Sequence, residues 1–94
     1  MYARLVLYTL GSGGRSKAQA LADELAPAIS AQKGCEGVTF FGDDADGEYG
    51  LFVLWESKED AEAAVKVIGP RLMQGLAGSV KGPPNMRLFE VLKQ

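Results

Sequence analysis

Seven consecutive residues from Tyr49 to Trp55 carry no charge, and this run constrains the fold more than any other part of the chain. It is rich in the β-branched and aromatic residues that strands favour. An antiparallel strand with one face in water alternates apolar and polar residues, whereas this run is apolar on both faces. Both faces of its sheet must therefore be covered. A chain of 94 residues has little material for two covers, so we expect a second copy of the chain on one face.

The remaining hydrophobic patterns predict a single α+β domain spanning residues 1–94. Strands are predicted over residues 2–10, 37–43, 49–55 and 86–92, and helices over about 16–32 and 57–76. The order βαββαβ predicts a ferredoxin-like fold. Right-handed crossovers place both helices on one face of a four-stranded antiparallel sheet with the strand order 4-1-3-2.

Glycine and proline residues mark the expected boundaries of these elements. Gly34 is a plausible end for the first helix, and the Asp-Gly pair that closes residues 43–47 suits a hairpin turn. Pro27 lies within the first helical pattern and predicts a kink or a weakened turn there. The pair Gly69-Pro70 is expected to interrupt or bend the second helix.

Composition excludes several classes of function. A net charge of −2 without a basic run argues against nucleic acid and anionic membranes as partners. No apolar stretch approaches the roughly 20 residues of a membrane span, and the first residues lack the layout of a signal peptide. We therefore expect a cytoplasmic protein. Because histidine is absent and Cys35 is the lone cysteine, a Ser-His or Cys-His pair is impossible within one chain, and a zinc site is improbable.

Aromatic residues are the first candidates for a binding site. Trp55 ends the apolar run and is either a core anchor or a pocket wall. Three tyrosines, Tyr2, Tyr8 and Tyr49, either pack with satisfied hydroxyls or line a cavity, where a phenol orients a ligand or donates to a developing oxyanion. The four phenylalanines, Phe40, Phe41, Phe52 and Phe89, are expected in the core by default.

Arg4 and Glu90 interrupt strands that are neighbours in the expected order. A cross-strand ion pair would explain both residues. The alternative is functional: a carboxyl group in an apolar pocket has a raised pKa and acts as a base, while Arg4 holds an anionic substrate. Together with Tyr8, these residues are the candidate catalytic groups.

Three short segments superficially resemble functional motifs. Residues 11–17 (GSGGRSK) follow a strand and open a helix, but they match neither phosphate-binding spacing, so a flexible turn is the better interpretation. The acidic residues of the 43–48 turn fail the EF-hand pattern and predict a solvated turn. Cys35 is interpreted as a small turn residue in preference to a reactive thiol. We therefore expect no metal and no cofactor.

Two segments carry a resemblance to a known family. The sequence Gly34-Cys35-Glu36-Gly37 precedes the second strand, and Leu-Trp-Glu-Ser-Lys-Glu-Asp-Ala occupies residues 54–61. With the element order, they make the chain resemble the antibiotic biosynthesis monooxygenase-like family. The resemblance implies a homodimer in which two sheets form a dimeric α+β barrel. It also implies a pocket between helices and sheet in each subunit, around which we expect Trp55, Tyr49, Phe40 and Met73.

The resemblance also has departures that narrow the chemistry. Haem-degrading members carry an asparagine, a helical tryptophan and a histidine, and here the first two positions fall at about Ala3 and Ala63 while histidine is absent. Haem degradation is therefore disfavoured. The resemblance instead implies a cofactor-independent monooxygenase acting on an aromatic or apolar small molecule. The alternative is a non-enzymatic protein that binds a small molecule in the same pocket.

Overall fold

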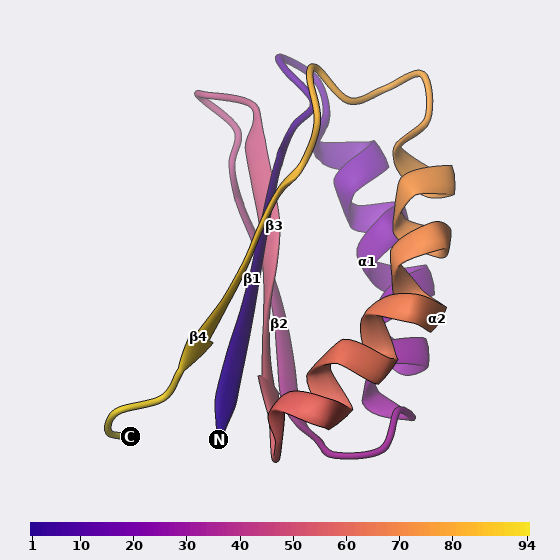
Figure 1. Cartoon of the computed structure of the whole chain (residues 1–94). Coiled ribbons are helices and arrows are strands. Elements are labelled where there is room, and N and C mark those ends of the chain that lie inside the picture. The colour runs from indigo at the N-terminus through magenta and orange to yellow at the C-terminus, as the bar shows by residue number, and fades with distance from the viewer.

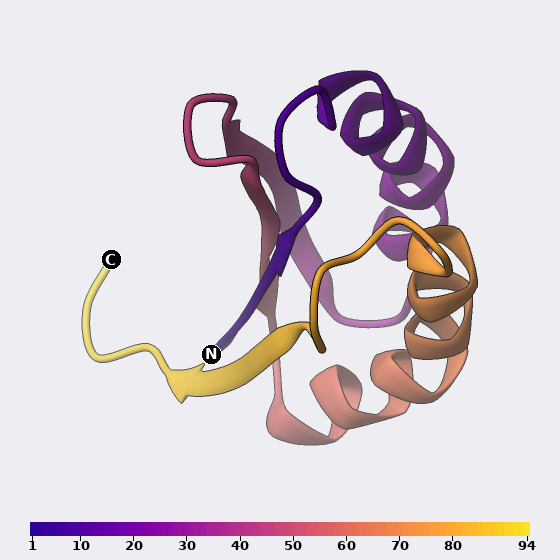
Figure 2. The same cartoon turned by 90° about the horizontal axis from the view of Figure 1, so that it is seen from above.

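The computed structural model describes residues 1–94 and contains two helices and four strands in the predicted order (Figure 1). The elements are β1 (Tyr2–Thr9), α1 (Arg15–Ser30), β2 (Cys35–Asp43), β3 (Glu48–Trp55), α2 (Lys58–Leu76) and β4 (Asn85–Glu90). The last strand is shorter than predicted at its C-terminal end. Val91 donates one backbone hydrogen bond to the carbonyl of Met1, and beyond it the chain leaves the sheet (Figure 2).

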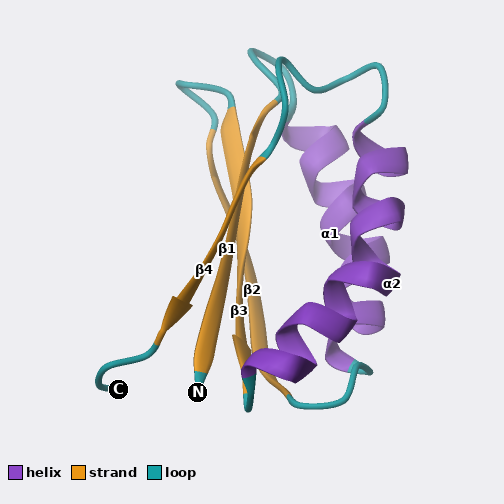
Figure 3. Ribbon diagram, viewed as in Figure 1, coloured by secondary structure: helices purple, strands orange, loops and turns teal.

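The four strands form one antiparallel sheet in the order β2-β3-β1-β4. Both helices cover the same face of this sheet, and the opposite face carries no element of the chain (Figures 2 and 3). The predicted ferredoxin-like α+β fold and strand order are confirmed. No helix is long and apolar enough to cross a membrane.

The apolar run of β3 sends alternate side chains to the two faces of the sheet. Tyr49, Leu51, Val53 and Trp55 are buried beneath the helices. Phe52 points to the opposite face and remains 38% exposed. The same alternation places Phe41 and Phe89 on the open face, where both are exposed. The prediction that these three phenylalanines lie in the core is therefore wrong for the single chain, because a strand turns every second residue away from the helices.

Each helix buries one stripe against the sheet. The stripe of α1 consists of Ala18, Leu21, Leu25 and Ile29, and that of α2 consists of Ala61, Ala64, Ile68, Leu72 and Leu76. Pro27 lies in the last turn of α1 and does not end the helix. The second helix likewise continues through Pro70, and it is visibly bent (Figure 1). The prediction of a bend in α2 holds, whereas an interruption does not occur.

The turns use glycine where the backbone requires a positive φ. Gly34 has φ +82° after α1, which is the left-handed conformation that ends many helices. Gly47 has φ +68° and closes the hairpin between β2 and β3. Its carbonyl accepts hydrogen bonds from the backbone N–H groups of Leu10 and Gly11, so the hairpin is tied to the end of β1. The predicted hairpin is therefore also a contact point for the loop before α1.

Candidate functional site

Arg4 is the one charged side chain that points from the sheet toward the helices within an apolar environment. It lies on β1 opposite Val53 of β3 and Leu88 of β4. A cavity of about 30 Å³ adjoins it. Eleven of the thirteen lining residues are hydrophobic. The lining is Arg4, Val6, Ile29, Leu51, Val53, Trp55, Ala61, Ala64, Val65, Ile68, Gly69, Leu72 and Met86.

The guanidinium group of Arg4 is incompletely satisfied. Its Nε atom is buried and has no hydrogen-bond partner, and it is the only buried side-chain polar atom in this state. Burial lowers the pKa of Arg4, while the charge of Glu62 on α2 acts in the opposite direction. Arginine nevertheless keeps its proton in proteins. The site therefore presents a positive charge and an unused N–H donor within an apolar lining, which suits an anionic oxygen on an otherwise apolar molecule.

Glu90 does not join this site. In the register of the sheet it lies opposite Tyr2, whereas Arg4 lies opposite Leu88. The chain contains one ion pair, Arg15 with Asp44, so the predicted pair between Arg4 and Glu90 is wrong. Glu90 is exposed on the edge strand and does not line the cavity. The apolar surroundings of a buried carboxyl base are absent around it in the single chain.

Tyr8 lies on the same face of β1 as Arg4 but outside the cavity. It is buried, and burial raises the pKa of its phenol to about 12. Its phenol therefore remains protonated throughout the physiological range and is poorly suited to be a general base.

Trp55 combines the two roles that the sequence left open. It is 3% exposed and belongs to the hydrophobic core, and its side chain also lines the cavity beside Arg4. Sequence reasoning thus placed this residue at the candidate site. The structure makes it a wall that is held in position by its own packing.

The other predicted pocket residues lie elsewhere. Phe40 and Tyr49 line a separate open groove of about 240 Å³ between α1 and β2, together with Arg15, Ala18, Gln19, Ala22, Phe41 and Gly42. Met73 is 47% exposed on α2 and lines neither hollow. The four predicted residues therefore do not form one pocket. Trp55 lines the cavity and Tyr49 the groove, because the two residues lie at opposite ends of the same strand.

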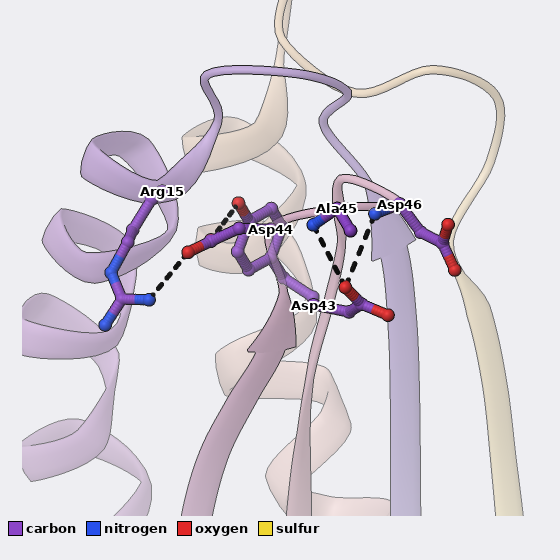
Figure 4. Close-up of polar contacts among 6 residues, drawn as sticks. Arg15, Asp43, Asp44, Ala45 and Asp46 are labelled. Atoms are coloured by element: carbon purple, nitrogen blue, oxygen red, sulfur yellow. Dashed lines mark hydrogen bonds and ion pairs between the residues drawn. The ribbon is translucent and has the colours of Figure 1, made fainter.

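A small polar network joins the turn between β2 and β3 to the start of α1 (Figure 4). It includes Arg15 and Tyr49, which also line the groove. The hydroxyl of Tyr49 donates to Asp44 Oδ1 over 2.8 Å, and Arg15 donates to Asp44 Oδ2 over 2.9 Å. Both contacts favour the ionised carboxylate, and they lower the pKa of Asp44, with the bond from Tyr49 as the larger cause. Asp43 Oδ1 accepts from the backbone N–H groups of Ala45 and Asp46. These carboxylates stabilise the turn and connect it to α1.

Sequence reasoning missed the α2 and β4 sides of the cavity. Ala61, Ala64 and Gly69 are small residues that leave space between α2 and the sheet. Both alanines lie in the predicted helix over residues 57–76, whose pattern predicts no cavity, and Gly69 is expected only to interrupt or bend that helix. Met86 was assigned to a strand without any role. A run of small residues on the inner stripe of α2, facing an arginine on β1, is the signal that could have located this site.

The fold has many counterparts among solved structures. A protein from Nitrosomonas europaea, provisionally named an antibiotic biosynthesis monooxygenase, superposes with a TM-score of 0.84 at 13% identity, covering 99% of this chain and all of its own. SnoaB, a cofactor-independent oxygenase from Streptomyces nogalater, crystallised as its N63A mutant, gives a TM-score of 0.80 at 15% identity and 99% and 94% coverage. A protein of unknown function from Nitrosomonas europaea, NE2512, gives 0.76 at 23% identity and 99% and 90% coverage.

The chain has the antibiotic biosynthesis monooxygenase fold. The resemblance carried by the two sequence segments is thus confirmed for the architecture, over nearly the whole length of the chain and of its structural counterparts. At these identities the likeness concerns the fold alone. No protein-family model and no curated protein matches the sequence.

Proposed function

We propose that the chain binds a small apolar molecule bearing an ionised oxygen at Arg4, and that it is a cofactor-independent monooxygenase of this molecule. The observation that carries the proposal is the buried, unpaired Nε of Arg4 beside an apolar cavity. An anionic oxygen at this place would satisfy the donor and neutralise the charge in one contact. The oxygenase part of the proposal rests on the fold shared with SnoaB.

The chemistry assigned to Arg4 is electrostatic. In a reaction without a cofactor, a phenolate substrate supplies the electrons: its ring C–H becomes a carbonyl with one atom of O₂. The other oxygen atom leaves as water with the ring hydrogen and the proton that the phenol released to the solvent on ionising. A positive charge fixed beside the phenolate oxygen stabilises the anion that reacts with O₂. Arg4 is thus a binding and charge-stabilising residue in this proposal, and Trp55 forms the wall beside the ring.

A second candidate function is binding without catalysis. It is favoured because neither predicted base joins the site: Glu90 is exposed, and the pKa of Tyr8 is raised to about 12. In this case the chain would hold or carry an anionic apolar molecule. Tyr8 and Glu90 would then have no chemical role.

Variants of Arg4 separate the two functions. Arg4→Met keeps the length and apolar stem of the side chain and removes the charge, while Arg4→Lys keeps the charge. Loss of a charge-assisted hydrogen bond costs about 1.5–3 kcal/mol, so we expect Arg4→Met to weaken benzoate binding roughly tenfold to a hundredfold in calorimetry. Its thermal stability should equal or exceed that of the wild type, because an unpaired buried donor is removed.

Oxygen uptake with resorcinol and 1,3-dihydroxynaphthalene then tests catalysis. Uptake by the wild type that Arg4→Met abolishes, with one quinone formed per O₂, supports the monooxygenase. Benzoate binding that depends on Arg4, without uptake on either phenol, supports binding alone. If Arg4→Met binds benzoate as well as the wild type does, the assignment of the site is wrong.

We further propose that the chain forms a homodimer through the sheet face opposite the helices. This face carries the exposed Phe41, Phe52 and Phe89, and the half-buried side chains of Leu5, Leu7 and Leu54 lie between them. Monomeric proteins rarely expose a contiguous apolar patch of this kind. A second copy offers the same apolar surface and would cover it.

A further inference from the structure

The cavity beside Arg4 is too small for the ligand proposed above. Its volume of about 30 Å³ leaves room for about one or two water molecules, whereas sites for small organic ligands occupy roughly 300–1,000 Å³. Part of the lining must therefore move before an aromatic molecule can reach Arg4. The structure indicates which part this is.

Most of the lining is held in place. Val6 and Leu51 belong to β1 and β3, the two central strands, which are hydrogen-bonded on both sides. Trp55 and the lining residues Ala61, Ala64 and Leu72 are buried in the core. Moving any of these side chains would open the core or break the ladder of the sheet.

Met86 is different from every other lining residue. It is the only one that is exposed, with 38% of its surface accessible. It lies opposite Val6 on β4, an edge strand that is bonded to β1 alone. Its side chain therefore borders the cavity on one side and solvent on the other. Methionine is unbranched and rotates about three bonds, so it can swing aside without disturbing the sheet.

Gly69 marks free space on the α2 side of the same cavity. It lines the cavity, and a Cβ added to it would meet no atom within 4 Å. The second helix packs on α1, β1 and β3, with no comparable packing on β4. An opening toward solvent between Met86 and Gly69 follows from these contacts.

We propose that Met86 is the gate of the Arg4 site and limits the size of the molecules that reach it. The proposal rests on the ligand site proposed above and names its specificity-determining residue. Met86 occupies the solvent side of the cavity, and a small ring takes the place of its thioether when this rotates outward. A larger ring system requires its removal.

Calorimetric titration with benzoate and 2-naphthoate tests the gate. We expect Met86→Ala to raise the affinity for 2-naphthoate at least tenfold while the affinity for benzoate changes less than threefold. Met73→Ala is the matched control, since Met73 is also an exposed methionine but lines no cavity. It should leave both affinities as in the wild type.

Gly69→Leu provides the opposite change. The new side chain occupies the entrance, and we expect both probes to bind at least tenfold more weakly. The added Cβ meets no atom within 4 Å, but Gly69 precedes Pro70, and proline disfavours helical backbone for a preceding residue with a Cβ. Thermal unfolding is therefore measured beside binding, and weaker binding counts as a blocked site when the unfolding temperature matches that of the wild type.

The outcomes distinguish the gate from the site. If Arg4→Met abolishes binding but Met86→Ala matches Met73→Ala with both probes, the gate is wrong and the Arg4 site stands. If Met86→Ala raises the affinity for 2-naphthoate even in combination with Arg4→Met, Met86 is the gate but Arg4 does not contact the ligand. If neither probe binds to Met86→Ala, both proposals are overturned.

Discussion

Arg4 and Tyr8 lie on the same face of β1, and burial acts on the two side chains in chemically opposite ways. Burial disfavours the charged form of each group, so the pKa of Arg4 falls while that of Tyr8 rises. Arginine remains charged all the same, and its unpaired Nε becomes a strong point of attachment. Tyrosine remains neutral and contributes packing. On the same face of one strand, the side chain that keeps its charge is thus a candidate ligand contact, and the side chain that stays neutral is a core residue.

The raised pKa of Tyr8 predicts how stability depends on pH. The folded protein holds the phenolic proton up to about pH 12, whereas the unfolded chain loses it near the ordinary value of 10.0. Between these values the folded state binds more protons, so the free energy of unfolding falls as pH rises. Tyr8→Phe should flatten this fall in urea titrations at pH 9, 10 and 11. A Tyr8→Phe curve parallel to that of the wild type would contradict the assignment.

Tyr49 provides the comparison for this measurement. Its hydrogen bond to Asp44 raises its pKa as well, so its effect on stability has the same sign. Tyr49→Phe should therefore also reduce the dependence of the free energy of unfolding on pH. The two reductions should not add fully in the double variant, because Tyr8 and Tyr49 lie directly opposite each other on β1 and β3.

At the scale of elements, the turn that follows α1 packs closely against the beginning of α2 at Gly34. The carbonyl of Gly34 accepts a hydrogen bond from the N–H of Glu56, and a Cβ on Gly34 would collide with the side chain of Asp60. The backbone N–H of Asp60 in turn donates a hydrogen bond to Ser57 Oγ at the start of α2. One glycine therefore supports both the end of α1 and the beginning of α2.

This packing predicts different costs for two glycines with the same backbone conformation. Gly34 and Gly13 both have φ +82°, but a Cβ on Gly13 would meet no atom within 4 Å. Gly13→Ala should lower the free energy of unfolding by about 1–2 kcal/mol, because alanine is strained in the left-handed conformation. Gly34→Ala should cost at least about 1 kcal/mol more, because strain and the collision with Asp60 combine. Chemical denaturation measures both, and equal costs would contradict the role given to Asp60.

At the scale of the whole molecule, the sheet has one face covered by the helices and one face that is apolar and open (Figure 2). The cavity beside Arg4 lies on the covered face, and the proposed partner lies on the other. Assembly and ligand binding therefore involve different surfaces of the same strands. A change on the open face should alter the oligomeric state without touching the lining of the cavity.

Phe52→Asp tests this separation. Phe52 lies on β3, one of the two central strands, and on the open face, where a carboxylate in a dimer interface would be desolvated without a partner. We expect the wild type to sediment at twice the chain mass of 10.0 kDa and the variant to sediment as a monomer. Val67→Asp, at an exposed valine on α2, should remain dimeric. A monomeric wild type at micromolar concentration would contradict the proposed assembly.

The sequence by itself determined the element order and the turn glycines, because periodicity and backbone conformation are local properties of the chain. The strand order followed from that element order together with the right-handedness of crossovers. It also placed Arg4 and Trp55 among the candidates, since a charge within an apolar strand and a tryptophan at its end are visible without a structure. Tertiary structure decided which candidates meet. The register put Leu88 opposite Arg4 and left Glu90 exposed, and it separated Tyr49 from Trp55 by the length of β3. The small residues of α2 and Met86 became a cavity only when helix and sheet packed together, since empty space is a property of several elements at once and has no signature in any one of them.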